Sequence, residues 1–329
     1  MRQTSASSPE FSLLTGEAIA STRGYWRRAW GRLLRNRVAV AGLVVIAGVA
    51  LLAVAAPLVS PADPSAQDVL NSRQAPSVEH LAGTDSLGRD MLSRLIYGAR
   101  VSLSVGVFAQ AIILCIGLPL GLIAGYRGGW AGSAIMRFTD LVYAFPDLLL
   151  IILLRAMLGG DIFTLFLIIG FVSWVNMARL VRGQVLSMRE CEFVEAARSL
   201  GAGDREIMTR HLLPNLTGPL VVLLALGIPR AIFIEAALSF IGFGVDPTTP
   251  TWGAMVQEGQ SAIGSASHLV IFPSAAIALV TLAFTFLGDG LRDALDPHVE
   301  DTTRPSEAAE TRRPAQRDGG ARRELPRAA

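Results

Sequence analysis

The chain has 329 residues, of which 51% are hydrophobic and 17% are charged, and its mean hydropathy is +0.46. A water-soluble protein of this length is hard to reconcile with that composition, so a membrane is the expected solvent. All 29 basic residues are arginine, which excludes a Walker A lysine and hence an ATPase site of that type. The two cysteines, Cys115 in an apolar run and Cys191 in a charged loop, predict neither a disulfide nor a metal site.

Six apolar segments approach the roughly 20 residues that a helix needs to cross about 30 Å of hydrocarbon. They cover residues 38–59, 101–126, 135–158, 162–181, 216–241 and 269–287. Backbone groups in lipid must be satisfied within the segment, so each is predicted to be a helix, bent where it contains Pro119, Pro146, Pro229 or Pro273. The sequence therefore predicts an all-α integral membrane protein with six transmembrane helices. A signal peptide is the alternative for the first run, which the 37 preceding residues disfavour.

Arginines are concentrated in alternate connections between these segments, and such connections are retained in the cytoplasm. The segment before the first helix, the second and fourth connections and the C-terminal tail carry most of them, whereas the third and fifth connections carry almost none. We therefore predict that both termini are cytoplasmic, with an N-terminal segment at 1–37 and a tail at 291–329. The tail is predicted to be largely disordered, because its composition shows no apolar periodicity. Between the N-terminal segment and the tail lie the first transmembrane helix at 38–59, an external loop at 60–100 and a core of five transmembrane helices at 101–290.

Residues 90–100 have the apolar spacing of a helix that lies at the membrane surface. Met91, Leu95 and Ile96 share one face, while Asp90 and Arg94 lie on the other. An interfacial helix and a simple extension of the second span both fit this pattern.

The connection between the fourth and fifth spans, residues 182–215, shows helical apolar spacing that is interrupted once. Gly201 is suited to close the first helix in a left-handed conformation, Asp204 to cap the second, and Pro214 to begin the fifth span. About 30 residues cannot enclose a hydrophobic core of their own. We therefore expect a partner protein to cover the apolar faces of these helices.

The same connection resembles the EAA loop of bacterial ABC importer permeases. Residues 195–197 read E-A-A and are followed by three residues, a glycine, nine residues and then H-L-L-P, against the family pattern E-A-A-x3-G-x9-I-x-L-P. His211 replaces the usual Ile, and residues 210–215 instead resemble the R-H-x-L-P-N form of peptide-importer permeases. In that family the loop forms a coupling helix seated on the nucleotide-binding subunit. The resemblance thus implies ATPase coupling through these residues: Glu195, Ala196, Ala197, Arg198, Gly201, His211, Leu213 and Pro214.

Two further stretches are similar to the second, C-type permease of dipeptide and oligopeptide importers. Residues 80–90 match its H-x-x-G-T-D-x-x-G-R-D signature, and residues 235–244 match its E-A-x-L-S-F-x-G-x-G segment. The resemblance implies a type I ABC importer permease fold in a bacterial cell membrane. The partners it implies are a homologous second permease, two ATP-binding-cassette ATPase subunits or domains that hold ATP and magnesium, and an external substrate-binding protein, but no nucleic acid. No catalytic residue, metal or cofactor is expected in this chain.

Polar residues within the predicted spans are candidates for a translocation pathway, because charge in lipid is costly. The candidates for a pathway or a partner contact are Asp140, Asp147, Arg155, Arg230 and Glu235, with Asn176 as a neutral one. Asp140, Asn176 and Glu235 are the possible pathway residues, and helix packing is the alternative for the two acids. We expect Arg155 to reach the membrane surface with its long side chain, and Arg230 to pair with another helix or subunit.

The expected function is that of one half of the pathway of an ATP-driven importer for di- or oligopeptides. ABC importers for nickel, glutathione or haem are alternatives within the same family. A proton-driven secondary transporter using Asp140 and Glu235 is the alternative from another class, although no internal inverted repeat supports it. An oligomeric channel would need a filter-like segment, which the sequence does not offer.

Overall fold

The computed structural model describes residues 24, 26–246 and 248–296, and regular secondary structure in these ranges is almost entirely helical. The extended contact found there is an isolated bridge between Thr84 and Asp90. The predicted all-α fold is thus confirmed for this part of the chain. The disorder predicted for the tail concerns residues that lie, from 297 onward, outside the described ranges, as do residues 1–23.

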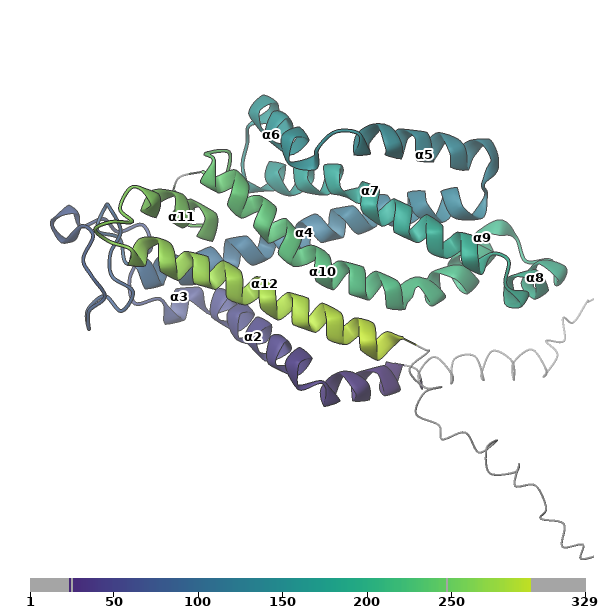
Figure 1. Ribbon diagram of the computed structural model, residues 1–329, viewed down its shortest axis with the longest axis horizontal. Helices are drawn as coiled ribbons and strands as arrows, with labels where there is room; N and C mark the ends of the chain where they lie inside the picture. Colours follow the sequence, from purple (N-terminus) through teal and green to yellow (C-terminus); the bar gives the residue numbers. More distant parts are fainter. Residues whose placement is uncertain (1–23, 25, 247, 297–329) are drawn as a thin grey trace, which may run out of the picture. The chain divides into compact units, whose positions relative to one another are not determined.

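Five of the six predicted spans are single helices in the structure (Figure 1). They are α2 (Arg37–Val54), α4 (Met91–Tyr126), α7 (Ile162–Met188), α10 (Leu213–Phe240) and α12 (His268–Leu295). Each is long and apolar enough to cross a membrane. After a break at Ala55, α2 is followed by the single turn of α3 (Ala56–Val59).

The third predicted span is instead two helices with a sharp corner between them. α5 (Gly129–Tyr143) and α6 (Asp147–Leu158) are bent by 82° relative to each other. Pro146 takes the N-cap position of α6. Because proline has no N–H group and restricts the residue before it, Pro146 separates the two helices and does not merely bend one. The other three prolines lie inside helices that continue past them: Pro119, Pro229 and Pro273.

α4 and α7 pack closely along a stripe of glycines. Gly117, Gly121 and Gly125 are spaced four residues apart on α4 and all face α7. A Cβ atom at Gly117 would lie 2.6 Å from the Cβ atom of Met177, and one at Gly121 would lie 2.6 Å from the carbonyl oxygen of Ala178. Small residues of this kind let two membrane helices approach until their backbones are in van der Waals contact. The α4–α7 pair is therefore the frame on which the functional segments are mounted.

The two ends of the bundle carry different short elements. At one end, α8 (Glu192–Ser199), α9 (Asp204–Glu206) and the π-helix η2 (Ile207–Leu212) connect α7 to α10, beside the last residue of α4. At the other end, the loop 60–90 and α11 (Trp252–Gln260) pack against the first turns of α4. We call them the α8 end and the α11 end. α4 has 36 residues, which separates them by about 54 Å.

α2 begins at the α8 end, and α12 ends there. Leu33 and Ala39 pack with Ala294, near the last residue of α12. Ala53, near the other end of α2, packs with Met91 at the start of α4. α2 therefore runs to the α11 end and α4 returns from it, so the first residue of α2 and the last residue of α12 lie at the α8 end.

Residues 90–100 form the beginning of α4 and not a separate helix at the membrane surface. The polar side of this turn is buried, because Arg94 is 2% exposed and Ser93 is 0% exposed. Ser93 accepts a hydrogen bond from the N–H of Ala62, and Arg94 donates to Glu258 on α11. The periodicity separated the two faces correctly, but it could not reveal that the polar face meets other polar protein groups and not water.

Candidate functional site

α8 is a short helix whose end is set by a glycine. Gly201 has a φ of +87°, the left-handed conformation predicted for it. Its N–H donates to the carbonyl oxygen of Arg198, and the N–H of Ala202 donates to that of Ala197, both at 3.0 Å. This pair of bonds is a Schellman motif, which closes the helix and turns the chain toward α9.

The apolar face of α8 is covered by the chain itself. Val194 is 0% exposed and Ala197 is 6% exposed, and both pack in one cluster with Tyr126 of α4 and with Val181 and Val185 of α7. The expectation that a partner protein must cover the apolar faces of this connection was wrong for Val194 and Ala197, which the chain itself buries, whereas Leu200 and Phe193 stay exposed. It treated the connection as an isolated segment of about 30 residues, whereas the ends of α4 and α7 supply the missing surface.

The opposite side of α8 is open to a partner. Leu200 is 87% exposed and Phe193 is 40% exposed, and Glu195, Ala196 and Arg198 lie exposed between them. We call these five residues the outer face of α8. Among the predicted coupling residues, Ala197 therefore supports the helix from behind, while the three at the middle of the outer face are free to meet another protein.

Asp204 does not cap the helix that follows. Gly203 holds the N-cap position of α9, and Asp204 is the first residue inside the helix. Its carboxylate accepts a hydrogen bond from the hydroxyl group of Tyr126 at 3.3 Å and lies 3.8 Å from the guanidinium of Arg127. Asp204 thus ties this connection to the end of α4 and is not a helix cap.

The rest of the connection runs into α10 without a turn, as one helix from Asp204 to Phe240. Pro214 lies in the first turn of α10 and has no N–H with which to continue the preceding hydrogen bonds. The wider π turn of η2 ends just before it, where the N–H of Leu213 donates to the carbonyl of Met208. Pro214 is exposed, and the other predicted coupling residues here, His211 and Leu213, are half-buried.

Glu235 is completely buried within α10. Its carboxylate accepts hydrogen bonds from the hydroxyl groups of Ser239, at 2.7 Å, and of Ser102, at 3.4 Å. Ser102 belongs to α4, so this carboxyl group joins α10 to α4. The contacts agree with helix packing, one of the two roles weighed for this acid.

Asp140 lies on the exposed face of α5 and pairs with Arg179 of α7, with 2.5 Å between carboxylate and guanidinium. The same guanidinium sits 3.9 Å from the centre of the Tyr143 ring. A cation over an aromatic face is held by the ring's negative electrostatic potential. Asp140 and Tyr143 together therefore hold Arg179 against α5.

Asn176 borders a pocket of about 430 Å³ at the corner between α5 and α6. Asp147 and Arg230 line the same pocket and form an ion pair, with 2.5 Å between Oδ2 and Nη2. Arg230 has thus found its partner on another helix, as predicted. Exposed charges on membrane-spanning helices are costly toward lipid, so this face of the bundle is directed at water or at protein.

Arg155 does not extend to the membrane surface as expected, since it is 7% exposed. Its guanidinium donates to four backbone carbonyl oxygens at 2.6 to 3.3 Å, those of Gly159, Asp161, Phe243 and Gly244. A guanidinium carries five N–H donors, so one side chain can serve all four. Arg155 thereby ties the α6–α7 connection to the segment after α10.

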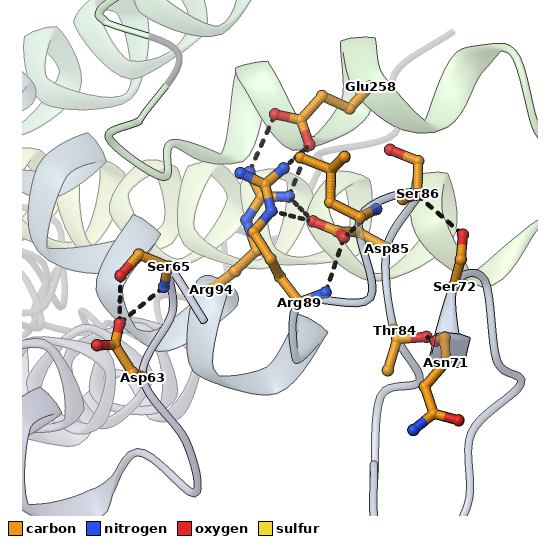
Figure 2. A network of polar contacts seen from close by, with 11 residues as sticks. Asp63, Ser65, Asn71, Ser72, Thr84, Asp85, Ser86, Arg89, Arg94 and Glu258 are labelled. Atoms are coloured by element: carbon orange, nitrogen blue, oxygen red, sulfur yellow. Dashed lines mark hydrogen bonds and ion pairs between the residues drawn. The ribbon is translucent and has the colours of Figure 1, made fainter. Parts of the chain in front are cut away.

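A network of four charged side chains holds the loop 60–90 on the bundle at the α11 end (Figure 2). Asp85 accepts hydrogen bonds from Arg89, at 2.6 Å, and from Arg94. Glu258 of α11 accepts from both arginines at 2.6 to 3.0 Å. Two carboxylates and two guanidinium groups balance in charge, so each of the three buried side chains, Asp85, Arg89 and Arg94, has an opposite charge as its partner.

The sequence did not reveal Glu258, because it lies 164 residues from Arg94 and no spacing rule connects the two. Elsewhere in the same loop, Asp63 accepts hydrogen bonds from the hydroxyl group and the N–H of Ser65, at 2.5 and 2.8 Å (Figure 2). These bonds favour the ionised carboxylate and hold the pKa of Asp63 below its usual value. The loop is thus built from local turns and anchored by one long-range charge network.

Residues 117–301 match the family described as binding-protein-dependent transport system inner membrane component. The chain belongs to this permease family. Residues 24–76 of the permease also match the N-terminal transmembrane domain of oligopeptide transport permease C. The resemblance drawn from the EAA loop and from the signature at 80–90 is thereby confirmed.

Several known permeases are similar over most of the chain. Identity is 42% with the dipeptide transport system permease protein DppC of Alkalihalophilus pseudofirmus, over 84% of this chain and 90% of that relative. It is 43% with the glutathione transport system permease protein GsiD of Pectobacterium atrosepticum, over 85% and 93%. It is 40% with the oligopeptide transport system permease protein OppC of Bacillus subtilis, over 83% and 90%.

Among solved structures, the MetNI methionine ABC transporter in an inward-facing conformation matches with a TM-score of 0.50. The match covers 63% of the permease and 98% of the solved chain at 20% sequence identity, so it speaks to the fold alone. It confirms the ABC importer permease fold. The family match and the similar permeases establish the chain as the permease subunit of an ABC importer.

Proposed function

We propose that this permease forms one half of the translocation pathway for di- or oligopeptides. The observation that carries the proposal is its 40 to 43% identity, over more than four fifths of the chain, with permeases named for dipeptide, glutathione and oligopeptide transport. Glutathione is itself a short peptide, so the three names share one substrate class. Neither a nickel or haem cargo nor a proton-driven cycle has comparable support.

The driving force comes from ATPase subunits, which hold ATP and magnesium. The chain contains no lysine and therefore no Walker A motif of its own. The outer face of α8 is the surface that meets the ATPase, because it presents Leu200 and Phe193 among charged side chains. Behind it, the buried side of α8 is packed on α4 and α7. A displacement of α8 by the ATPase is therefore transmitted to the helices that border the pathway.

The α8 end lies in the cytoplasm, and both chain termini lie there with it. This orientation follows from the arginine-rich segment that precedes α2 and from the arginines between α7 and α10. A second, homologous permease completes the pathway. A substrate-binding protein outside the membrane delivers the peptide to the α11 end.

Purification of the tagged permease from its native membranes tests the coupling surface. Leu200→Arg should abolish co-purification of the ATPase and lower uptake more than tenfold, because it places an unpaired charge where an apolar side chain meets its partner. Leu70→Arg is the matched control, since Leu70 is 97% exposed and lies at the α11 end. It should retain the ATPase. Retention of the ATPase and of full uptake by the Leu200 variant would show that α8 does not couple.

Uptake into proteoliposomes that contain the complete complex tests the substrate class. ATP-dependent accumulation of labelled dialanine is expected, and an excess of unlabelled dipeptide should reduce it, whereas nickel chloride should not. Competition by glutathione would narrow the specificity within the peptide class. A complex that accumulates nickel or haem but no peptide would contradict the proposal.

A further inference from the structure

The pocket at the α5–α6 corner brings groups of both charges together beside an amide. Asp147, Asn176 and Arg230 line a volume of about 430 Å³, and Tyr143 and Ser173 border it as well. A smaller hollow of about 70 Å³ shares Ser173, Asn176 and Arg230 with it. Ligand sites in proteins are typically hollows of about 300–1,000 Å³ in which a few polar groups fix the orientation of the ligand. The corner therefore has the size and the chemistry of a site for a small polar ligand.

This pocket lies within the membrane-spanning part of the bundle, which a substrate must cross. Asn176 is the fifteenth of the 27 residues of α7, and Arg230 is the eighteenth of the 28 residues of α10. Asn176 is thus near the middle of α7, and Arg230 lies ten residues before the end of α10. The break at Pro146 brings Asp147, the first residue of α6, to the same pocket. Charges at this depth need water or a polar partner, which a translocation pathway provides.

The charges of Asp147 and Arg230 remain accessible to a ligand although the two side chains form an ion pair. The side chains of Asp147 and Arg230 are 46% and 54% exposed, and an ion pair of this exposure contributes little to stability. The network at the α11 end shows the contrast, because the side chain of Arg94 is 2% exposed there. A ligand that carries both an ammonium and a carboxylate group can replace the pair, and it leaves no charge without a partner.

We propose that this pocket is a transit subsite for zwitterionic peptides, in which Arg230 binds the terminal carboxylate and Asp147 the terminal ammonium group. The planar guanidinium suits a carboxylate because it donates two parallel hydrogen bonds. Asn176 can both donate to and accept from the peptide backbone. The inference rests on the proposed function as a peptide permease and adds to it the place and the polarity of substrate contact.

The test uses the complete complex, with both permeases, the ATPases and the binding protein, reconstituted in proteoliposomes. Uptake is compared for labelled dialanine, its C-terminal amide and its N-acetyl derivative. For each peptide, the uptake by the variant is divided by the uptake by the wild type, so that the binding protein's own preference among the peptides cancels. Arg230→Gln should lower the uptake of dialanine about tenfold and leave the amide within about twofold, as expected for one lost ionic contact. Asp147→Asn should also lower the uptake of dialanine, but it should leave the uptake of the N-acetyl peptide, which has no terminal ammonium group, within about twofold.

Arg179→Gln is the matched control, because Arg179 forms a similar ion pair with Asp140 but does not line the pocket. Its effect should be equal for all three peptides. Equal losses for all peptides in the Arg230 and Asp147 variants would overturn the subsite, because a mere helix-to-helix contact would affect every peptide alike. Failure of the wild-type complex to accumulate any peptide would instead reject the proposed function itself.

Discussion

Replacing Arg94 by methionine should destabilise the permease by about 3–5 kcal/mol, the usual result of removing one partner from a buried ion pair. Arg94 is 2% exposed and donates to Asp85 and to both carboxylate oxygens of Glu258. Without it, two carboxylates face the single guanidinium of Arg89. Methionine fills much of the space of the arginine stem, so the loss is chiefly electrostatic and not a matter of packing.

A second substitution separates the charge effect from any general damage. In the double variant Arg94→Met with Glu258→Gln, Asp85 and Arg89 remain as a balanced pair. The double variant should therefore be more stable than the sum of the two single effects by about 1.5–3 kcal/mol, the contribution of hydrogen bonds to a charged group.

Thermal unfolding of the purified permease in detergent measures these differences, and Arg94→Met should lower the Tm on the order of 10 °C. Arg100→Met is the control, because Arg100 lies exposed on the same helix and a surface substitution changes stability by only about 0.5 kcal/mol. The reasoning is refuted if the Arg94 variant unfolds no earlier than this control. It is also refuted if the two single effects add without coupling.

Three further substitutions test the helix contacts and the loop. Gly121→Leu should lower stability by at least about 1–3 kcal/mol by forcing α4 away from α7, whereas Gly183→Leu, with no atom within 4 Å of its added Cβ, should leave the Tm unchanged. Gly201→Val should cost about 1–2 kcal/mol, because its φ of +87° disfavours a β-branched side chain; Gly201→Asn should unfold close to wild type, and equal Tm values would disprove the strain. Arg155→Lys should lower stability by about 1–3 kcal/mol, because an ammonium group cannot reach all four carbonyl oxygens, and limited proteolysis should then cut first after α10 and not elsewhere.

Local properties of the chain were sufficient to predict a large part of this molecule. Apolar length alone located five of the six predicted spans as single helices, because a helix in lipid must satisfy its own backbone and so needs no knowledge of its neighbours. The left-handed conformation of Gly201 followed in the same way from the steric freedom of a residue without Cβ.

Tertiary structure decided which surfaces are free and which charges meet. Burial of Val194 and Ala197 on α8 depends partly on Tyr126 of α4 and Val181 of α7, which lie outside residues 182–215, so that segment alone could not show it. The pairings of Glu258 with Arg94 and of Asp147 with Arg230 also join distant segments, across 164 and 83 residues. Sequence determines where helices form because that is a short-range matter of lipid and backbone. The contacts between helices depend on how the helices pack in space. These contacts also decide where the outer face of α8 and the pocket at the α5–α6 corner lie.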